Sequence, residues 1–199
     1  MKLSKLISFV FHPILMPTYA LLLLFQCIPL FSQFMDIEQK NQILKLTCIF
    51  TFFLPILSVF ILKKLRVVSS YYMENQEERR WPLLFALGWY YLLFLFLETL
   101  HIHFVVVNLL VGAMLILVIS AIVSNFWKIS LHMLGIGGVL GAFLAIHSLF
   151  GGNIYLIIAL IFCAGCVGFA RINENAHSLK QVYLGFVVGV GAEFLIFYF

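Results

Sequence analysis

Long apolar segments follow one another along this chain and leave little polar sequence between them. A membrane-crossing helix needs about 20 mostly apolar residues, and seven segments come near that length. They cover approximately residues 6–31, 43–62, 82–99, 102–124, 131–150, 153–170 and 182–199. The third, sixth and seventh are short, so each is compatible with a partial or tilted element. The pattern predicts an all-α fold, a polytopic transmembrane bundle of six to seven helices.

The composition also indicates that the chain is embedded in a lipid bilayer. Hydrophobic residues make up 64% of the 199 residues and charged residues only 10%, whereas soluble domains carry about 25% charged residues. The longest polar stretch, residues 66–81, is too short for a soluble domain, so we expect a single integral membrane domain over 1–199. The N-terminus resembles a signal peptide but lacks an A-x-A-like cleavage site, and we predict a retained first helix.

Charge, cysteine and glycine patterns indicate which partners and which chemistry a membrane protein with this sequence has. The net charge is +4, but the basic residues flank apolar segments, which argues against a nucleic-acid partner. A C-x-x-C pair lies inside an apolar segment without a second ligand pair, which favours packed side chains over metal or redox chemistry. Gly137 and Gly141 are four apart, as are Gly185 and Gly189, and this spacing lets helix backbones approach closely in lipid.

Cations and histidines from distant parts of the sequence fall on one side of the bundle if all seven segments cross. That side holds the following residues: His12, Arg79, Arg80, Lys128, Ser130, His132, Arg171, His177 and Lys180. Ionisable residues at membrane depth are costly and usually functional, and Arg, Lys and His side chains together suit an anion such as phosphate. The alternative is ordinary basic residues that flank helix ends.

The opposite side holds residues of metal-ligand type, namely Glu98, His101, His103 and His147, with Glu193 leaning toward them. Glu98 and His101 have the Glu-x-x-His spacing of di-iron helical bundles. Such sites use two of these motifs and two further carboxylates, and this chain has one motif. We therefore favour interfacial histidines and predict no metal and no cofactor, with a metal-dependent membrane enzyme as the alternative.

Three motifs on the cationic side resemble signatures of the type 2 phosphatidic acid phosphatase superfamily. Arg171 and His177 have the spacing of its third signature, S-R-x5-H-x3-D. The tetrapeptide "ISLH" resembles the second signature, P-S-G-H, in Ser130 and His132. "ERRWP", which contains both arginines of the 2–3 connection, is similar to the end of the first signature, K-x6-R-P. The motifs appear in the family's order and cover residues 78–181.

The sequence departs from the family pattern at several positions. Ala170 replaces the Ser of the third signature and Gln181 replaces its Asp, while Ile129 and Leu131 replace the Pro and Gly of the second. In the first signature Trp81 separates the arginine from the proline, and no Lys lies seven positions before either arginine.

The resemblance implies a membrane phosphatase that hydrolyses a lipid or polyprenyl phosphate through a phosphohistidine. His177 would be the nucleophile and His132 the acid that protonates the leaving alkoxide. The groups that would bind phosphate are Arg171, Arg80, Arg79 and Ser130, with Lys128 assisting. The expected partners are membrane lipids, with an anionic, phosphate-bearing lipid as substrate or ligand.

The missing Asp leaves two functions open. Gln181 can accept a hydrogen bond from the imidazole but offers no charge, and Glu174, three residues before His177, is a possible substitute. The alternative to an enzyme is a catalytically inactive protein that binds or transports lipid phosphates on the same scaffold.

The membrane side of the site is predicted in two conflicting ways. Ten of the twelve Lys and Arg residues, all except Lys40 and Lys45, lie on the site side. The positive-inside rule then places the site in the cytoplasm, whereas the resemblance implies a site that faces outward. We expect an integral protein of the bacterial cytoplasmic membrane in either case.

Overall fold

The computed structural model describes residues 3–33, 35–70, 76–100 and 102–199, in which every regular element is helical. Seven helical segments of this part are long and apolar enough to cross a membrane: Leu3–Cys27, Ile37–Lys64, Arg80–Thr99, Phe104–Val123, Leu131–Phe150, Ile154–Asn173 and Leu179–Ile196. The predicted all-α bundle of six to seven transmembrane helices is therefore confirmed, and the chain is an integral membrane protein.

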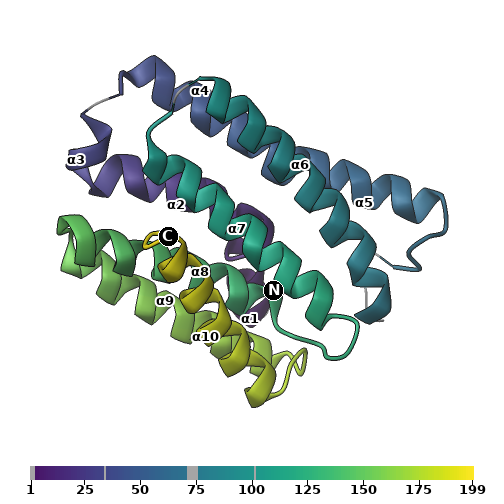
Figure 1. Ribbon diagram of the computed structural model, residues 1–199. Helices are drawn as coiled ribbons and strands as arrows, with labels where there is room; N and C mark the ends of the chain where they lie inside the picture. Colours follow the sequence, from purple (N-terminus) through teal and green to yellow (C-terminus); the bar gives the residue numbers. More distant parts are fainter. Residues whose placement is uncertain (1–2, 34, 71–75, 101) are drawn as a thin grey trace.

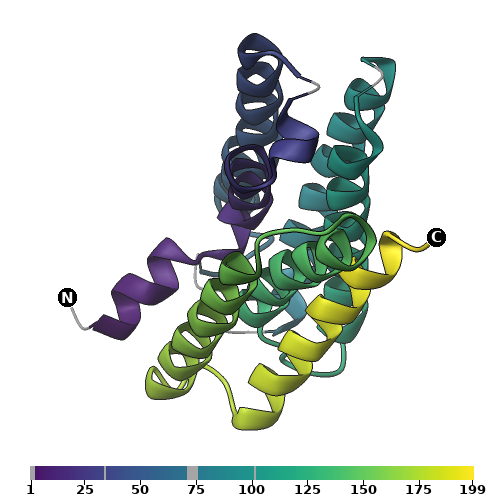
Figure 2. The same cartoon turned by 90° about the vertical axis from the view of Figure 1, so that its left-hand side faces the viewer.

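The helices are α1 (Leu3–Val10), α2 (Met16–Cys27), α3 (Pro29–Ser32), α4 (Ile37–Cys48), α5 (Leu54–Lys64), α6 (Arg80–Thr99), α7 (Phe104–Val123), α8 (Leu131–Phe150), α9 (Ile154–Asn173) and α10 (Leu179–Ile196). In Figure 1, α8, α9 and α10 lie side by side, α4, α5 and α6 form the far side, and α2 and α7 lie between the two groups. The first candidate span is broken, because the chain turns at His12 and a 3-10 turn covers Pro13–Leu15. Figure 2 shows α1 at an angle to α2, and α1 packs against α9.

The second span is continuous but irregular. A capping box at Asp36 and Gln39 starts α4, and five residues of π-helix, Ile49–Phe53, join α4 to α5. Pro55 is the second residue of α5, and a proline inside a helix removes a backbone donor and clashes with the preceding turn. The wider π turn accommodates that loss, as such turns do at helix irregularities.

Glycines set the register between α8 and α10. A Cβ on Gly137 would meet the carbonyl oxygen of Phe186 at 2.6 Å, and one on Gly141 would collide with that of Val190. In the other direction, a Cβ on Gly189 would collide with the carbonyl oxygen of Leu134. The partners advance in the same direction on both helices, so α8 and α10 run parallel with their N-termini side by side. The predicted close approach at the two glycine pairs is confirmed.

Candidate functional site

The parallel register brings the first turns of α8 and α10 to one end of the bundle, where α9 ends. A Cβ on Gly185, in the second turn of α10, would lie 2.9 Å from the carbonyl oxygen of Ser130, the N-cap of α8. Arg171 stands in the last turn of α9. Six side chains at this end each lie within electrostatic range of at least one other, and we call them the cationic cluster: His12, Arg79, Lys128, His132, Arg171 and His177.

Arg171 is held by a short network that ties α9 to α1. Its Nη1 donates to Glu174 Oε2 at 2.6 Å and to Ser8 Oγ at 3.0 Å, and Ser8 Oγ donates to the same carboxylate oxygen at 3.1 Å. The arginine side chain is 14% exposed and that of Glu174 19%, so the pair is largely shielded from solvent. One turn earlier, Ser4 accepts from Asn173 Nδ2 at 2.7 Å. These contacts fix the guanidinium at the centre of the cluster.

Two donors at this site are buried and have no hydrogen-bond partner in the described chain. They are Arg171 Nε and the hydroxyl of Ser130, a residue that is fully buried. Buried polar groups are normally paired, so unpaired donors beside cations suit a site that accepts oxyanion ligands. Glu174 Oε1 is also buried without a partner, and its charge competes with any anion for Arg171.

His132 is oriented by the end of α1. Its Nε2 lies 3.0 Å from the carbonyl oxygen of Ser8, one of the last carbonyls of that helix, which have no partner within the helix. A carbonyl only accepts, so Nε2 carries the proton and Nδ1 carries the lone pair of the neutral ring. The His12 ring packs edge-on against this imidazole with centroids 5.3 Å apart. Proton exchange with a ligand is therefore left to Nδ1.

His177 is oriented through a helix cap. Ser178 and Gln181 form a capping box at the start of α10, and Gln181 Oε1 accepts from the backbone N–H of Ser178 at 3.1 Å. The same oxygen lies 3.2 Å from Nδ1 of His177. Since Oε1 accepts, we assign the proton to Nδ1, which leaves the Nε2 lone pair for a ligand. Burial, reinforced by the charge of Arg171, lowers the pKa of His177 to about 4, so this imidazole is neutral at pH 7.

The two arginines before α6 have different surroundings. Arg79 is half-buried, and burial together with the charge of Arg171 lowers its pKa from the ordinary arginine value. Arg80 is exposed, with its guanidinium carbon 5.3 Å from the centroid of the Trp81 ring. Arg79 therefore belongs to the cluster and Arg80 does not. Lys128 is half-buried and close enough for its charge to reach His177.

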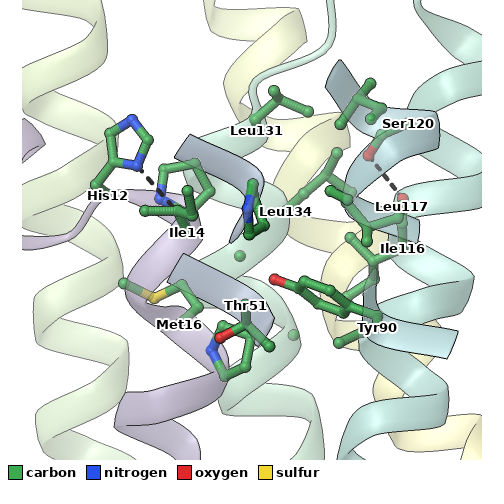
Figure 3. Close-up of a pocket in the computed structure, with 18 of the residues that line it drawn as sticks. His12, Ile14, Met16, Thr51, Tyr90, Ile116, Leu117, Ser120, Leu131 and Leu134 are labelled. Atoms are coloured by element: carbon green, nitrogen blue, oxygen red, sulfur yellow. Dashed lines mark hydrogen bonds between the residues drawn. The ribbon is translucent and has the colours of Figure 1, made fainter. Parts of the chain in front are cut away.

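A cavity of about 440 Å³ opens beside the cluster and runs into the bundle. His12 and Arg79 line one end of it, and its wall is otherwise mostly apolar. Figure 3 shows His12 and Leu131 toward one end and Thr51 and Tyr90 toward the other. Glu193 also lines this cavity; it is 5% exposed, and its Oε2 has no partner in the described chain. Glu193 therefore lies inside the bundle, beside Gly112 of α7 and Gly138 of α8.

One further expectation is changed by this geometry. Glu174 does not orient His177, because its carboxylate binds Arg171 and Ser8, and the imidazole is held by Gln181. Of the metal-ligand residues on the other side, His103 caps α7 by accepting from the N–H of Val105. Within the described residues no three His, Cys, Asp or Glu side chains gather to hold a metal ion, and His101 lies outside those residues.

Ser8 and His12 are site residues that the motifs did not identify. Ser4 and Ser8 are four apart on a short helix whose other residues are apolar except Lys5, so one face of α1 carries both hydroxyls. That spacing is the one sequence signal for the contact with α9. Comparison with family models, with curated proteins and with solved structures gave no match to this chain.

Proposed function

We propose that the protein is a membrane phosphatase that hydrolyses a lipid or polyprenyl phosphate through a phosphohistidine, with an organisation like the type 2 phosphatidic acid phosphatases. The observation that carries the proposal is that one end of the bundle holds two buried donors without a partner, Arg171 Nε and the Ser130 hydroxyl, together with two oriented imidazoles. Arg79 and Lys128 add positive charge. The expected location is the bacterial cytoplasmic membrane.

The proposed chemistry uses one atom of each histidine. Nε2 of His177 attacks phosphorus, and the bond to the alkoxide leaving group breaks. His132, when protonated, passes a proton from Nδ1 to that alkoxide and then accepts one from the water that hydrolyses the phosphohistidine. Arg171 and Ser130 bind the equatorial oxygens of the transition state, where the charge is spread. The balance is one lipid phosphate and one water giving one lipid alcohol and inorganic phosphate.

Gln181 sets the expected rate. It accepts the Nδ1 proton of His177 and so selects the reactive tautomer, but a neutral amide does not stabilise the positive imidazole that forms on attack. A hydrogen bond to a charged group is stronger than a neutral one by about 1–2 kcal/mol, or about 5- to 30-fold in rate. We therefore expect slow turnover.

The second candidate is a lipid-phosphate binder or transporter without chemistry. Two observations favour it: the carboxylate of Glu174 already occupies Nη1 of Arg171, and the group that holds His177 is uncharged. Binding of an anionic lipid without release of phosphate would distinguish this function from hydrolysis.

The first experiment measures phosphate release from dodecyl phosphate and phosphatidic acid by purified protein in the presence of a metal chelator. We expect release that is lost in His177→Ala and retained in His147→Ala, whose imidazole lies near the opposite end of α8. Equal release by wild type and His177→Ala would exclude the phosphohistidine mechanism. Lipid binding without release in wild type would favour the second candidate.

A second experiment separates a slow enzyme from an inactive one. Gln181→Glu keeps the length of the side chain and the capping box while adding a charge beside His177. The matched control is Gln39→Glu, which makes the same change in the capping box of α4. We expect faster phosphate release in Gln181→Glu, by about 5- to 30-fold, and no change in the control. No gain would mean that the missing carboxylate does not limit the rate.

A further inference from the structure

The cavity beside the cationic cluster has polar groups at its ends and an apolar body. Arg79 and His12 stand at the end where the cluster lies, and the wall between is made of aliphatic and aromatic side chains from α2, α5, α6, α7 and α8. A volume of about 440 Å³ lies in the range of ligand sites. A positive entrance and an apolar interior match a molecule with an anionic head and a hydrocarbon chain.

The depth of the cavity corresponds to one leaflet of a bilayer. Its lining on α6 begins beside Arg79 and continues to Tyr90, a distance of about 16 Å at the rise of an α-helix. On α7 the lining extends from Ser120 to Leu109, which is again about 16 Å. The hydrocarbon core of a bilayer is about 30 Å thick, so the cavity reaches from the boundary to about the midplane.

Glu193 marks the inner part of the cavity. Its side chain fills the space beside two glycines, because a Cβ on Gly112 would collide with its Oε2 and one on Gly138 would lie 3.2 Å from its Cγ. A carboxyl group in a transmembrane helix is costly, and such residues face cavities or partners inside a bundle. Glu193 faces the cavity and has no protein partner for Oε2 in the described chain. Its carboxyl group is therefore a polar group in the inner part of an otherwise mostly apolar cavity.

We propose that this cavity is the binding site for one hydrocarbon chain of an anionic lipid, with the phosphate at the cationic cluster and the chain end near Glu193. The identity of the head as a phosphate rests on the proposed function, but the chain site rests on the cavity alone. The lipid is then recognised inside the bundle rather than in the surrounding bilayer. Side chains from five helices contact its chain, so chain shape as well as head charge determines which lipid binds.

The test is photolabelling with dodecyl phosphate that carries a diazirine at the far end of its chain, followed by mass spectrometry of the labelled peptides. We expect labels on the peptides that contain Tyr90, Leu109 and Glu193. The same diazirine placed next to the phosphate is expected to label Pro82 and Leu131 instead, since both line the outer part of the cavity. Labels confined to lipid-facing residues such as Phe162, which is 72% exposed, would overturn the proposal.

A pair of variants supplies the control. Ala86→Phe introduces a ring into the cavity, whereas Ala159→Phe introduces the same ring on the exposed face of α9. We expect Ala86→Phe to lose the inner labels and Ala159→Phe to keep them. Inner labels that persist in Ala86→Phe would also overturn the proposal. If that variant does not fold, the positions labelled by the two probes in the wild-type protein test the proposal on their own. Labelling inside the cavity without phosphate release would leave the chain site standing and remove the phosphatase.

Discussion

Replacing Gly189 by alanine tests whether the contact between α8 and α10 builds the site. The new Cβ would collide with the carbonyl oxygen of Leu134 and lie 3.0 Å from the backbone nitrogen of Gly138. Both are backbone atoms that cannot move aside independently, so the two helices must separate. Overpacking of this kind costs about 1–3 kcal/mol. The separation also shifts His177 relative to His132, and a misplacement of about 1 Å reduces catalysis about 100-fold.

Gly191→Ala is the matched control, because it lies on the same helix and its Cβ would meet nothing within 4 Å. Alanine is favoured over glycine inside a helix by about 0.5–1 kcal/mol, and both variants share that gain. The difference between them therefore isolates the interhelical contact. We expect the free energy of unfolding in one detergent to be about 1–3 kcal/mol lower for Gly189→Ala than for Gly191→Ala. Equal stability of the two variants would refute the parallel register from which the site is derived.

Three further predictions concern the side chains of the cluster. Glu174→Gln removes the charge that competes for Arg171, so binding of dodecyl phosphate measured by calorimetry should tighten about 10-fold, whereas Arg171→Ala should weaken it by a similar factor. The imidazole of His177, followed by 15N NMR, should stay neutral as the pH falls from 7 to 5 and become protonated near pH 4, because burial reinforced by the charge of Arg171 lowers its pKa; protonation centred near 6.5 would mean that the imidazole is not buried. Ser8→Ala removes two hydrogen bonds to the ion pair. It should lower the free energy of unfolding, measured by chemical denaturation, by about 1–3 kcal/mol. The control Ser148→Ala, whose hydroxyl lies far from the cluster, should lower it by less.

The transmembrane segments were predictable because the length of an apolar segment is set directly by bilayer thickness. The predicted helix ends were less accurate where polar residues continue a helix beyond its apolar part. α10 begins at Leu179, earlier than the expected start of the last segment, because the Ser178–Gln181 capping box satisfies its first backbone donors. That box is readable in the sequence. The break at His12 and the π turn before Pro55 are consequences of proline, which marks an irregularity without fixing its form.

The candidate site was predictable only in part, for a physical reason. Spacing along the chain placed Arg171, His177 and His132 on one side, but spacing does not tell which of two neighbouring arginines points inward or what a carboxylate binds. Those outcomes depend on packing between helices, which puts Ser8 of α1 against Arg171 and thereby takes Glu174 away from the imidazole. The cavity likewise arises from five helices together and has no signature in any one of them.

The most direct test of the account is a structure of the protein with bound orthovanadate, a mimic of the transferring phosphate. We predict that the vanadium is bonded to Nε2 of His177, with its oxygens hydrogen-bonded to Arg171 Nε and the Ser130 hydroxyl. Vanadate bound elsewhere, or excluded from this end of the bundle at saturating concentration, would contradict the claim that these residues form one oxyanion site.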